Sequence, residues 1–513
     1  MMRRPFRFSG SPRGSCKRLP FIKFSQRTHT YLGLIFAAYF LLMALTGILL
    51  NHPELIRGLA LPVALLPDSH TLRNGARMAV RDTVSDGDSL IVGGRAGVWY
   101  SPDRAEHFIP LMEGYPQDAD DRDTLCLLHY RHQGRTHLLA GTRNGLFHYD
   151  FSGVWKNVAL PQDDAAIVAL IRRDNDLLLF TEQQCLISPM GTHFEFRPHP
   201  LLYAQADLPS TVPLIRWLLA LHSGAVLGLP GRLFVDAAAT ILVFLCLSGL
   251  WLCPTSRRFL PPVPGIKLPF WWRNHLQLGI RSVLFLLLIT LSGVVIRPPF
   301  SALIKDCRIA RSSMIFHPDD SRRPRIDRVA LSADHSEILI ATRDGLFGGP
   351  ADLHTPLRRQ SVAAPISAMG VNVLYSLQDG RWIIGSFAGL YLWDEKQRCA
   401  SALITPASRR PLVTALITHE RRPVAFVDYR DGPRPCRLPD TDDTPQPIHF
   451  PVALGELSVP LRHILFELHN GRILRQWLGI WYTALIPLGG GLLCLVLTSG
   501  VYDWWSRTST TKK

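Results

Sequence analysis

Residues 30–50 read TYLGLIFAAYFLLMALTGILL, which is 21 consecutive positions without a charged side chain. A helix of this length measures about 31 Å, enough to cross the hydrocarbon core of a bilayer, which is roughly 30 Å thick. A secretory signal peptide has a shorter apolar run ending in small residues, whereas this run ends in Leu50-Asn51-His52-Pro53. The stretch therefore predicts an uncleaved first transmembrane helix over 30–52.

Three further apolar runs of similar length occur at 233–253, 276–296 and 477–502. The second and fourth runs follow lead-ins that read as helical, so these units extend over 213–253 and 461–505. Tryptophans gather at the ends of the runs, where amphipathic rings favour the membrane–water interface; they are Trp251, Trp271, Trp272, Trp504 and Trp505. Buried core helices would not require this clustering, so four transmembrane helices are predicted.

Positive charge is concentrated in short segments of this chain. The 513 residues carry a net charge of +15, from 56 Lys and Arg against 41 Asp and Glu. Most of the excess lies in 1–29, 254–275 and 506–513, and short basic segments mark the cytoplasmic side of a membrane. Both termini are therefore expected in the cytoplasm, and the long segments 53–212 and 297–460 in the periplasm, for a multi-pass protein of a bacterial inner membrane. Charge placed in this way argues against a nucleic-acid partner.

The nine cysteines show no CxxC pair and no regular spacing, so an iron–sulfur cluster or a zinc ribbon has no support. Five cysteines fall in the two long outer segments, and a disulfide among them stays open: Cys126, Cys185, Cys307, Cys399 and Cys436.

A recurring pattern fills the two outer segments: a β-rich run, a turn, and Gly followed by two apolar residues. Clear copies lie at 90–99, 138–147, 338–347 and 382–391, and weaker copies at 177–187 and 424–436. Asn-Gly and Asp-Gly supply the positive φ of a tight hairpin turn, and a period of about 40–48 residues is typical of propeller blades. Three blades cannot close a ring, so the two segments are expected to form one propeller of six or seven blades. Two separate β-domains are the alternative within this α + β membrane fold.

Four histidines occur at matching positions near the predicted helix ends. His29 and His275 lie at the inner ends of the first and third spans, and His222 and His469 lie in the lead-ins on the outer side. Imidazole is an axial ligand of haem iron. Each inner histidine is followed four residues later, on the same helix face, by a glycine that leaves room for a flat macrocycle (Gly33 and Gly279). The matching positions indicate a tandem duplication in which each half is helix, β-domain, helix.

Distance along the helices divides the histidines into two sets. His29 and His52 are 23 residues apart, roughly 35 Å along a helix, so one haem cannot use both. We predict an inner haem between His29 and His275, and an outer haem between His222 and His469. His52 is an alternative outer ligand, although the matching position after the third span holds proline.

Two charged residues fall within the spans, where charge is costly and usually functional. Arg281 follows His275 by about a turn and a half and is a candidate partner for a haem propionate. Asp236 either carries a proton or lies at the outer interface. The alternative for the four histidines is that they are interfacial residues that hydrogen-bond lipid headgroups or helix ends.

Several motifs resemble those of the PepSY-associated transmembrane protein family. The first set is His29-x3-Gly33 with Thr46-Gly47-x3-Asn51-His52. The second set is Leu221-His222-Ser223-Gly224-x3-Gly228-x2-Gly231-Arg232 with Ser248-Gly249-Leu250-Trp251. The resemblance covers the spans and their approaches, and it implies haem and iron uptake, as in inner-membrane reductases for ferric siderophores. That family usually carries small PepSY modules where this chain has blade-like repeats, which leaves the substrate open.

The expected function is electron transfer across the membrane on two b-type haems, with membrane lipid as the surroundings. No dinucleotide-binding or P-loop motif occurs, so electrons are expected from quinol or a separate reductase. The acceptor that the resemblance implies is a ferric siderophore or another iron chelate at the outer face. The alternative is a non-enzymatic sensor or assembly scaffold whose propeller binds a partner.

Overall fold

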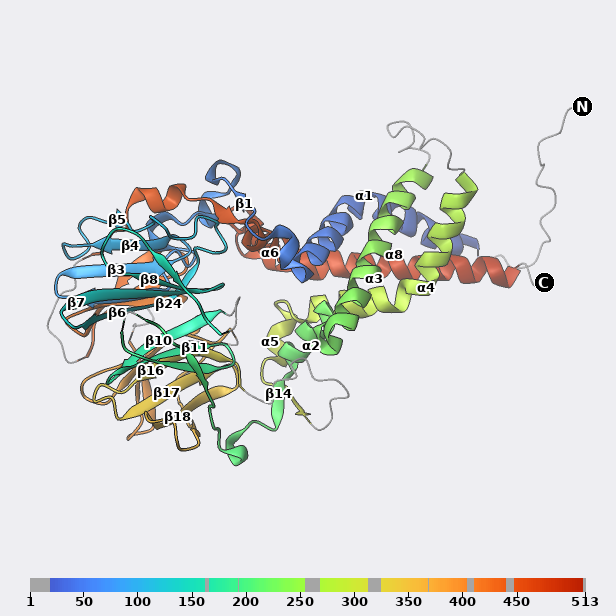
Figure 1. Ribbon diagram of the computed structural model, residues 1–513. Coiled ribbons are helices and arrows are strands. Elements are labelled where there is room, and N and C mark those ends of the chain that lie inside the picture. Colours follow the sequence, from blue (N-terminus) through green and yellow to red (C-terminus); the bar gives the residue numbers. More distant parts are fainter. Residues whose placement is uncertain are drawn as a thin grey trace, which may run out of the picture. The chain divides into compact units, whose positions relative to one another are not determined.

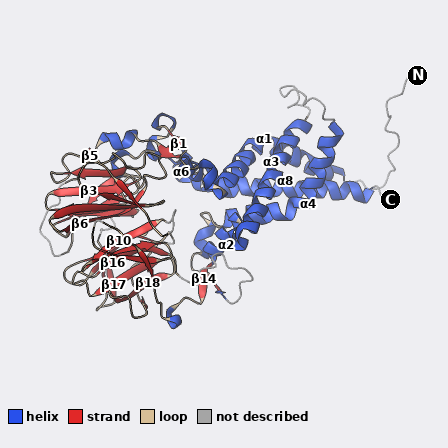
Figure 2. Ribbon diagram, viewed as in Figure 1, coloured by secondary structure: helices blue, strands red, loops and turns tan. Residues whose placement is uncertain are grey.

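The computed structural model describes residues 19–161, 166–191, 193–253, 268–311, 324–367, 369–403, 410–439 and 447–510. Parts of the predicted basic segments 1–29, 254–275 and 506–513 lie outside the described residues, namely 1–18, 254–267 and 511–513. The chain divides into two compact units. The helix unit comprises the chain up to Pro53, Thr211–Asp319, and the chain from Leu465; the propeller unit comprises Glu54–Ser210 and Asp320–Ile464 (Figure 1). Long helices build the first unit and short strands build the second (Figure 2).

Four helices of the helix unit are long and apolar enough to cross a bilayer, as predicted. They are α1 (Leu19–Asn51), α3 (Gly228–Leu252), α4 (Leu268–Val295) and α8 (Tyr482–Thr510). Helices α1 and α4 begin earlier than predicted. The prediction counted only the uncharged, apolar run of each span, whereas the helix also includes the polar residues that precede this run. His29 and His275 therefore lie inside helices and not at their ends.

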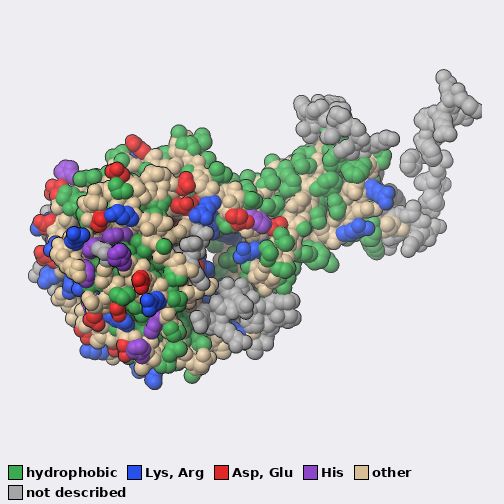
Figure 3. Space-filling view, in the orientation of Figure 1, with side chains coloured by type: hydrophobic (Ala, Val, Ile, Leu, Met, Phe, Trp, Pro, Cys, Tyr) green, Lys and Arg blue, Asp and Glu red, His purple; other side chains and the backbone are tan. Residues whose placement is uncertain are grey.

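The four long helices pack in a ring in which α1 contacts α3, α3 contacts α4, α4 contacts α8, and α8 contacts α1. Helices α1 and α4 are thus diagonal to each other. Glycines in α8 allow close approach: a Cβ added at Gly489 would lie 2.3 Å from the Tyr39 ring, and one at Gly490 would lie 2.3 Å from Val294. The outward surface carries exposed side chains such as Leu45, Leu284 and Leu495, and hydrophobic side chains dominate it (Figure 3). Such a surface suits contact with lipid.

Two short helices precede the second and fourth long helices at equivalent places. They are α2 (Leu214–Ser223) and α6 (Leu461–His469), and each ends at a left-handed glycine, Gly224 or Gly471. A 3₁₀ turn follows each glycine. After α2 it leads directly into α3, and after α6 it leads into the short helix α7 (Arg475–Leu478), which precedes α8. The repeated plan matches the tandem halves that the sequence predicts. The helix unit also contains α5 (Phe300–Ile304) and the strand pair β14 (Thr211–Pro213) and β15 (Arg308–Ala310).

The propeller unit contains six antiparallel sheets, five with four strands and one with three. The first segment supplies β2–β5 (Asp82–Asp86, Ser89–Gly94, Gly97–Ser101, Ile109–Pro110), β6–β9 (Thr124–His132, Arg135–Thr142, Leu146–Tyr149, Lys156–Val158) and β10–β13 (Ile167–Arg173, Asp176–Thr181, Cys185–Pro189, Arg197–His199). The second segment supplies β16–β19 (Ile326–Leu331, Glu337–Thr342, Gly345–Pro350, Arg358–Gln360), β20–β23 (Val371–Ser376, Trp382–Ser386, Gly389–Asp394, Cys399–Ala402) and β24–β26 (Val413–His419, Arg422–Asp428, Gly432–Pro435). A pair of short strands, β1 (Ala60–Leu61) and β27 (Val459–Pro460), joins the two ends of the unit.

Each of the six predicted repeats is the hairpin between the second and third strands of a blade, including the two weaker copies. In β17–β18 the Thr342 hydroxyl accepts a hydrogen bond from the Asp344 amide at 3.1 Å, and Gly345 takes a φ of +139° that closes the turn. A side chain at that φ would be strained, which accounts for the recurring glycine.

The six inner strands close one ring. Strand β10 of the third blade contacts β16 of the fourth, and β24 of the sixth contacts β2 of the first. The contact between β24 and β2 includes a hydrogen bond of 2.6 Å from the Thr83 hydroxyl to the Leu416 carbonyl. The joint propeller is therefore confirmed with six blades, and the alternative of two separate β-domains is wrong.

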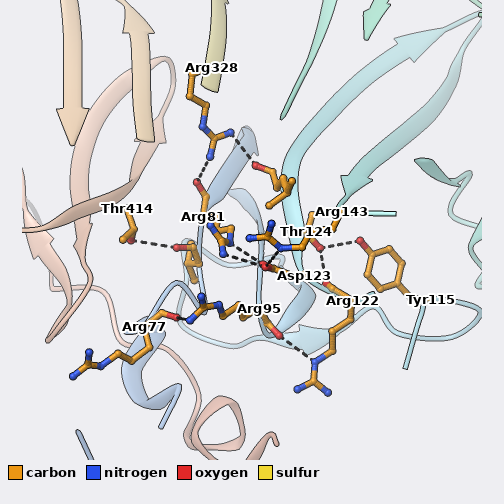
Figure 4. A network of polar contacts seen from close by, with 12 residues as sticks. Arg77, Arg81, Arg95, Tyr115, Arg122, Asp123, Thr124, Arg143, Arg328 and Thr414 are labelled. Carbon is orange, nitrogen blue, oxygen red and sulfur yellow. Dashed lines mark hydrogen bonds and ion pairs between the residues drawn. The ribbon is translucent and has the colours of Figure 1, made fainter. Parts of the chain in front are cut away.

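A network of polar contacts connects side chains and backbone groups from several blades (Figure 4). Arg328 on β16 reaches across and donates to the carbonyls of Arg81 at 3.1 Å and Leu125 at 2.9 Å, which belong to the first and second blades. Asp82 lies beside it: burial raises the pKa of the Asp82 carboxyl, and the charge of Arg328 opposes that shift. One arginine thus ties three blades together.

An ion-pair network around the buried Asp123 lies in the same region (Figure 4). Asp123 accepts hydrogen bonds from Arg81 at 2.7 and 3.0 Å and from Arg143 at 2.9 Å. Burial favours the neutral carboxyl, but the two guanidinium groups outweigh it and hold the pKa of Asp123 at about 2. All eight described cysteines are free, so no disulfide joins those that the sequence left open.

Two buried histidines in the second blade form a stacked pair. His137 Nδ1 and His148 Nε2 share a hydrogen bond of 2.9 Å, and Tyr130 stacks on the His137 ring. Burial lowers the pKa of both rings, that of His148 to about 4, with the neighbouring His137 as the next cause. Both imidazoles are therefore neutral in the folded chain near neutral pH.

We expect the protein to lose stability as the pH falls from about 6.5, the ordinary histidine value, toward 4. In this window the unfolded chain binds more protons than the folded chain, so acid favours unfolding. Thermal unfolding of the purified protein at a series of pH values measures the slope, and His148→Gln, which does not titrate, should flatten it. The exposed His335→Gln should keep the wild-type slope. If His148→Gln and wild type lost stability equally with falling pH, His148 would not be a cause of the acid sensitivity.

Candidate functional site

The first histidine pair lies inside the ring of long helices. His29 on α1 and His275 on α4 come from the diagonal helices, with ring centroids 6.2 Å apart and planes at 79°. His29 Nδ1 donates to the Val496 carbonyl of α8 at 2.9 Å. His275 Nδ1 hydrogen-bonds to Ser248 Oγ of α3 at 2.8 Å. The two rings thus engage all four long helices.

The second pair is formed by the two short helices. His222 on α2 and His469 on α6 have ring centroids 6.2 Å apart, with planes at 52°. His222 Nδ1 donates to the Ile289 carbonyl of α4 at 2.9 Å. His469 Nδ1 hydrogen-bonds to Thr46 Oγ1 of α1 at 2.8 Å. The two pairs are the ones that the sequence predicts, and the centroid spacing is the same in both.

Hydrogen bonding assigns one tautomer to all four rings. A carbonyl only accepts, so His29 and His222 carry their proton on Nδ1. The hydroxyls of Thr46 and Ser248 donate to helix carbonyls, at 2.7 Å to Leu42 and 2.6 Å to Phe244, so each accepts from the histidine. Nε2 then bears the lone pair in every ring. No described residue hydrogen-bonds to Nε2 in any of the four, which leaves this atom available as a metal ligand.

A Ser/Thr-Gly dipeptide in another helix lies against each histidine. A Cβ added at Gly500 would be 3.0 Å from the His29 ring, and one at Gly293 would be 2.7 Å from the His222 ring. Gly47 and Gly249 face His469 and His275 in the same way. Sequence reasoning missed this role, although the signal was present because each long helix carries one such dipeptide: Thr46-Gly47, Ser248-Gly249, Ser292-Gly293 and Ser499-Gly500.

The His222–His469 pair, which the sequence predicts as the outer site, has the protonation state that a metal ligand needs. Burial lowers the pKa of His222, and burial together with the neighbouring His222 lowers that of His469 to about 3. Both imidazoles are thus neutral at physiological pH and keep the lone pair that a metal needs.

His52, the alternative outer ligand, has another partner. Its Nε2 lies 2.7 Å from Asp236 Oδ2, and the Asn51 amide donates to Asp236 Oδ1 at 3.1 Å. Asp236 therefore connects the C-terminal end of α1 to α3, and His52 is not in either pair. The contacts of Asp236 are thus known, whereas the idea that it carries a proton stays a prediction.

The remaining predicted site residues lie away from the rings. The nearest neighbour of a Cβ at Gly33 would be Val496 at 3.8 Å, and at Gly279 it would be Leu245 at 3.7 Å, so both glycines lie at helix–helix contacts. Arg281 is exposed on α4. Its role toward a haem propionate, like the macrocycle role of the two glycines, stays a prediction.

The histidine pairs fit a haem by spacing and by donor chemistry. An imidazole nitrogen binds a first-row metal at about 2 Å, with the ring centroid about 1 Å behind it, so two rings sharing one iron have centroids about 6 Å apart. The observed 6.2 Å agrees with this at both sites. The Nδ1 hydrogen bonds to carbonyls and hydroxyls are the outer contacts that orient metal-ligating histidines.

The four long helices and a family comparison together define a multi-pass membrane protein. A family model described as the PepSY-associated TM region matches residues 26–507. The chain belongs to this family. Among proteins with curated descriptions, none matches the chain.

Several solved structures show a remote likeness to this chain. The virginiamycin B lyase of Staphylococcus aureus is 8% identical with a TM-score of 0.37, and the match covers 71% of this chain and 96% of that one. The extracellular domain of a B. thetaiotaomicron protein described as a one-component system is 10% identical with a TM-score of 0.34, covering 71% of this chain but only 39% of that one. The computationally designed Ika8 protein is 8% identical with a TM-score of 0.31, covering 71% and 98%.

Proposed function

We propose that this protein carries electrons across the bacterial inner membrane on two b-type haems and reduces a ferric siderophore or another iron chelate at the periplasmic face during iron uptake. One observation carries the proposal: four histidines from matched positions form two pairs whose rings are spaced for a shared iron. Haem held in this way exchanges single electrons.

A bare metal ion is a poorer fit than haem. Among the described residues, the one group of three or more His, Cys, Asp or Glu side chains close enough to hold an ion is Asp103, Glu106 and His107, in the propeller unit. A pair of imidazoles alone does not complete the coordination of zinc or copper. A macrocycle brings its own four nitrogens, so two histidines are all that the chain must supply.

The chain's residues would hold two such groups in sequence through the bilayer. Seventeen residues separate His29 from Thr46, the partner of His469, which is roughly 25 Å along α1. The same number of positions separates His275 from Ser292, which lies on α4 and contacts His222 of α2. Both histidines of a pair would be ligands, which would leave no coordination position open and would favour electron transfer over oxygen chemistry. Quinol or a separate reductase would be the electron donor.

The absorption spectrum of the purified protein tests this proposal. Full-length protein from cells supplied with haem is expected to be red, to show b-type absorption that dithionite reduces, and to contain two haems per chain. The physical reason is that both pairs present lone-pair nitrogens at the correct spacing. A colourless protein from the same cells would reject the proposal.

A colourless protein would favour the second function, a sensor or assembly scaffold. One observation supports it: the propeller unit contains a pocket of about 450 Å³ between its first two blades. Charged and aromatic side chains line the pocket, including Asp86, Tyr100, His129, Arg131, Asp150 and Phe151. Such a mixture is suited to a polar ligand with an apolar part.

A further inference from the structure

A charged cluster adjoins the outer histidine pair. Glu467 on α6 is 1% exposed and forms an ion pair with Arg472 at 2.9 Å. Arg297, just after α4, interacts electrostatically with both of these residues and with His222 and His469. The Arg297 side chain makes no hydrogen bond or ion pair with any residue that the structure describes.

The cluster holds more positive than negative charge. Two arginines face one glutamate, which leaves a net charge of about +1 in a partly buried place. Burial, and then the charge of Arg472, lower the pKa of Arg297 to about 10, so its guanidinium is still protonated at neutral pH. An uncompensated charge removed from water is costly unless an anion accompanies it.

A buried amide without a partner lies in the same place. Asn470, next to His469, is 3% exposed, and neither its Nδ2 nor its Oδ1 has a hydrogen-bond partner. The Arg472 Nε is likewise unsatisfied. The matching residue of the first half, Ser223, instead donates its hydroxyl to the Ala220 carbonyl at 3.3 Å. Buried polar groups in native proteins are almost always paired, so orphaned donors beside excess positive charge indicate an anionic ligand.

We propose that Arg297, Arg472 and Asn470 form a carboxylate-binding subsite that holds a propionate of the haem at the outer pair, and that the charge of Arg297 raises the reduction potential of that haem. This inference rests on the proposed function. Reduction lowers the positive charge on the iron. A nearby cation therefore repels the reduced form less and favours it over the oxidised form. The first half has Asn51 and the His52–Asp236 pair at the equivalent place, so the subsite is specific to the second half.

Redox titration of the outer haem tests the proposal, in a His275→Ala background that leaves only this haem. Arg297→Gln is expected to lower the ratio of reduced to oxidised haem about tenfold at a fixed potential, which is about 59 mV for one electron. Arg297→Lys should retain most of the wild-type ratio. Arg232→Gln, an exposed arginine at the start of α3, is the matched control and should change the ratio less than twofold.

Haem with methyl-esterified propionates identifies the partner of the arginine. If Arg297 pairs with a propionate, the effect of Arg297→Gln should shrink at least threefold when the esterified haem is bound. An unchanged effect would overturn the subsite, and so would the absence of any shift with ordinary haem. Protein without haem in the parent background would overturn the proposed function as well, which separates the two failures.

Asn470→Leu gives a readout that a purely structural role would not produce. Leucine removes the unsatisfied amide, so the haem-free protein should unfold at a higher temperature than the parent. The same change should weaken the binding of ordinary haem severalfold. A variant that loses stability without haem and binds haem normally would refute the role of Asn470 in the subsite.

Discussion

Under the proposed function, replacing His469 with alanine is expected to remove one of the two proposed haems and to leave the other bound. His469 supplies one of the two imidazoles of this pair, and its ring centroid lies 6.2 Å from that of His222. No other described histidine ring lies opposite His222. The inner pair shares no ligand with the outer pair, so His29 and His275 should keep their haem. Haem content per chain, measured on the purified protein, should fall from two to one.

His52→Ala is the matched control for this experiment. His52 was the alternative outer ligand, but its Nε2 bonds Asp236 at 2.7 Å. The variant should therefore retain both haems. Loss of a haem in His52→Ala, together with its retention in His469→Ala, would show that the outer site is assembled from a different pair.

Replacing Arg328 with methionine is expected to destabilise the propeller unit by about 1–3 kcal/mol, because carbonyls that lose a charged hydrogen-bond donor inside a protein are left unsatisfied. The change removes the hydrogen bonds to the Arg81 and Leu125 carbonyls and leaves Asp82 without the positive charge beside it. Methionine fills a similar length, so the loss is mainly electrostatic. Urea unfolding followed by the fluorescence of the buried Trp382 and Trp393 measures it.

Arg197→Met is the control on the same unit. Its side chain is 82% exposed and pairs with Glu195 at 3.2 Å, so the expected change is within about 0.5 kcal/mol. If Arg328→Met unfolds at the same urea concentration as Arg197→Met, the inner strands do not depend on the arginine that joins them.

Much of the fold could be predicted because its signals are local. A run of 21 uncharged residues predicts a span wherever it occurs, and a Gly in a hairpin turn predicts the turn. Helix boundaries were less accurate, since α4 begins at Leu268 and includes Trp271 and Arg273, which hydropathy assigns to a loop. The number of blades could not be fixed at six from the repeats alone, because closure depends on contacts between the first and last blades.

The histidine pairs were predictable from duplication, but their surroundings were not. Nothing local in Ser499-Gly500 indicates that His29 packs there, because the two lie more than 460 residues apart and meet only through helix packing. The orphaned amide of Asn470 is likewise a tertiary property: its sequence neighbours say nothing of whether a partner is present.

The order of the blades along the chain has a consequence for biosynthesis. The first three blades are made before α3 and α4, and the last three follow α4, so the ring cannot close until both long helices and the second segment have been synthesised. During that interval the third blade lacks the apolar face of the fourth, against which Val168, Leu178 and Phe180 pack in the folded chain, and exposed apolar surface of this kind invites aggregation. Once closed, the ring joins the two halves of the polypeptide at two junctions, because blades of the first half contact blades of the second half on both sides.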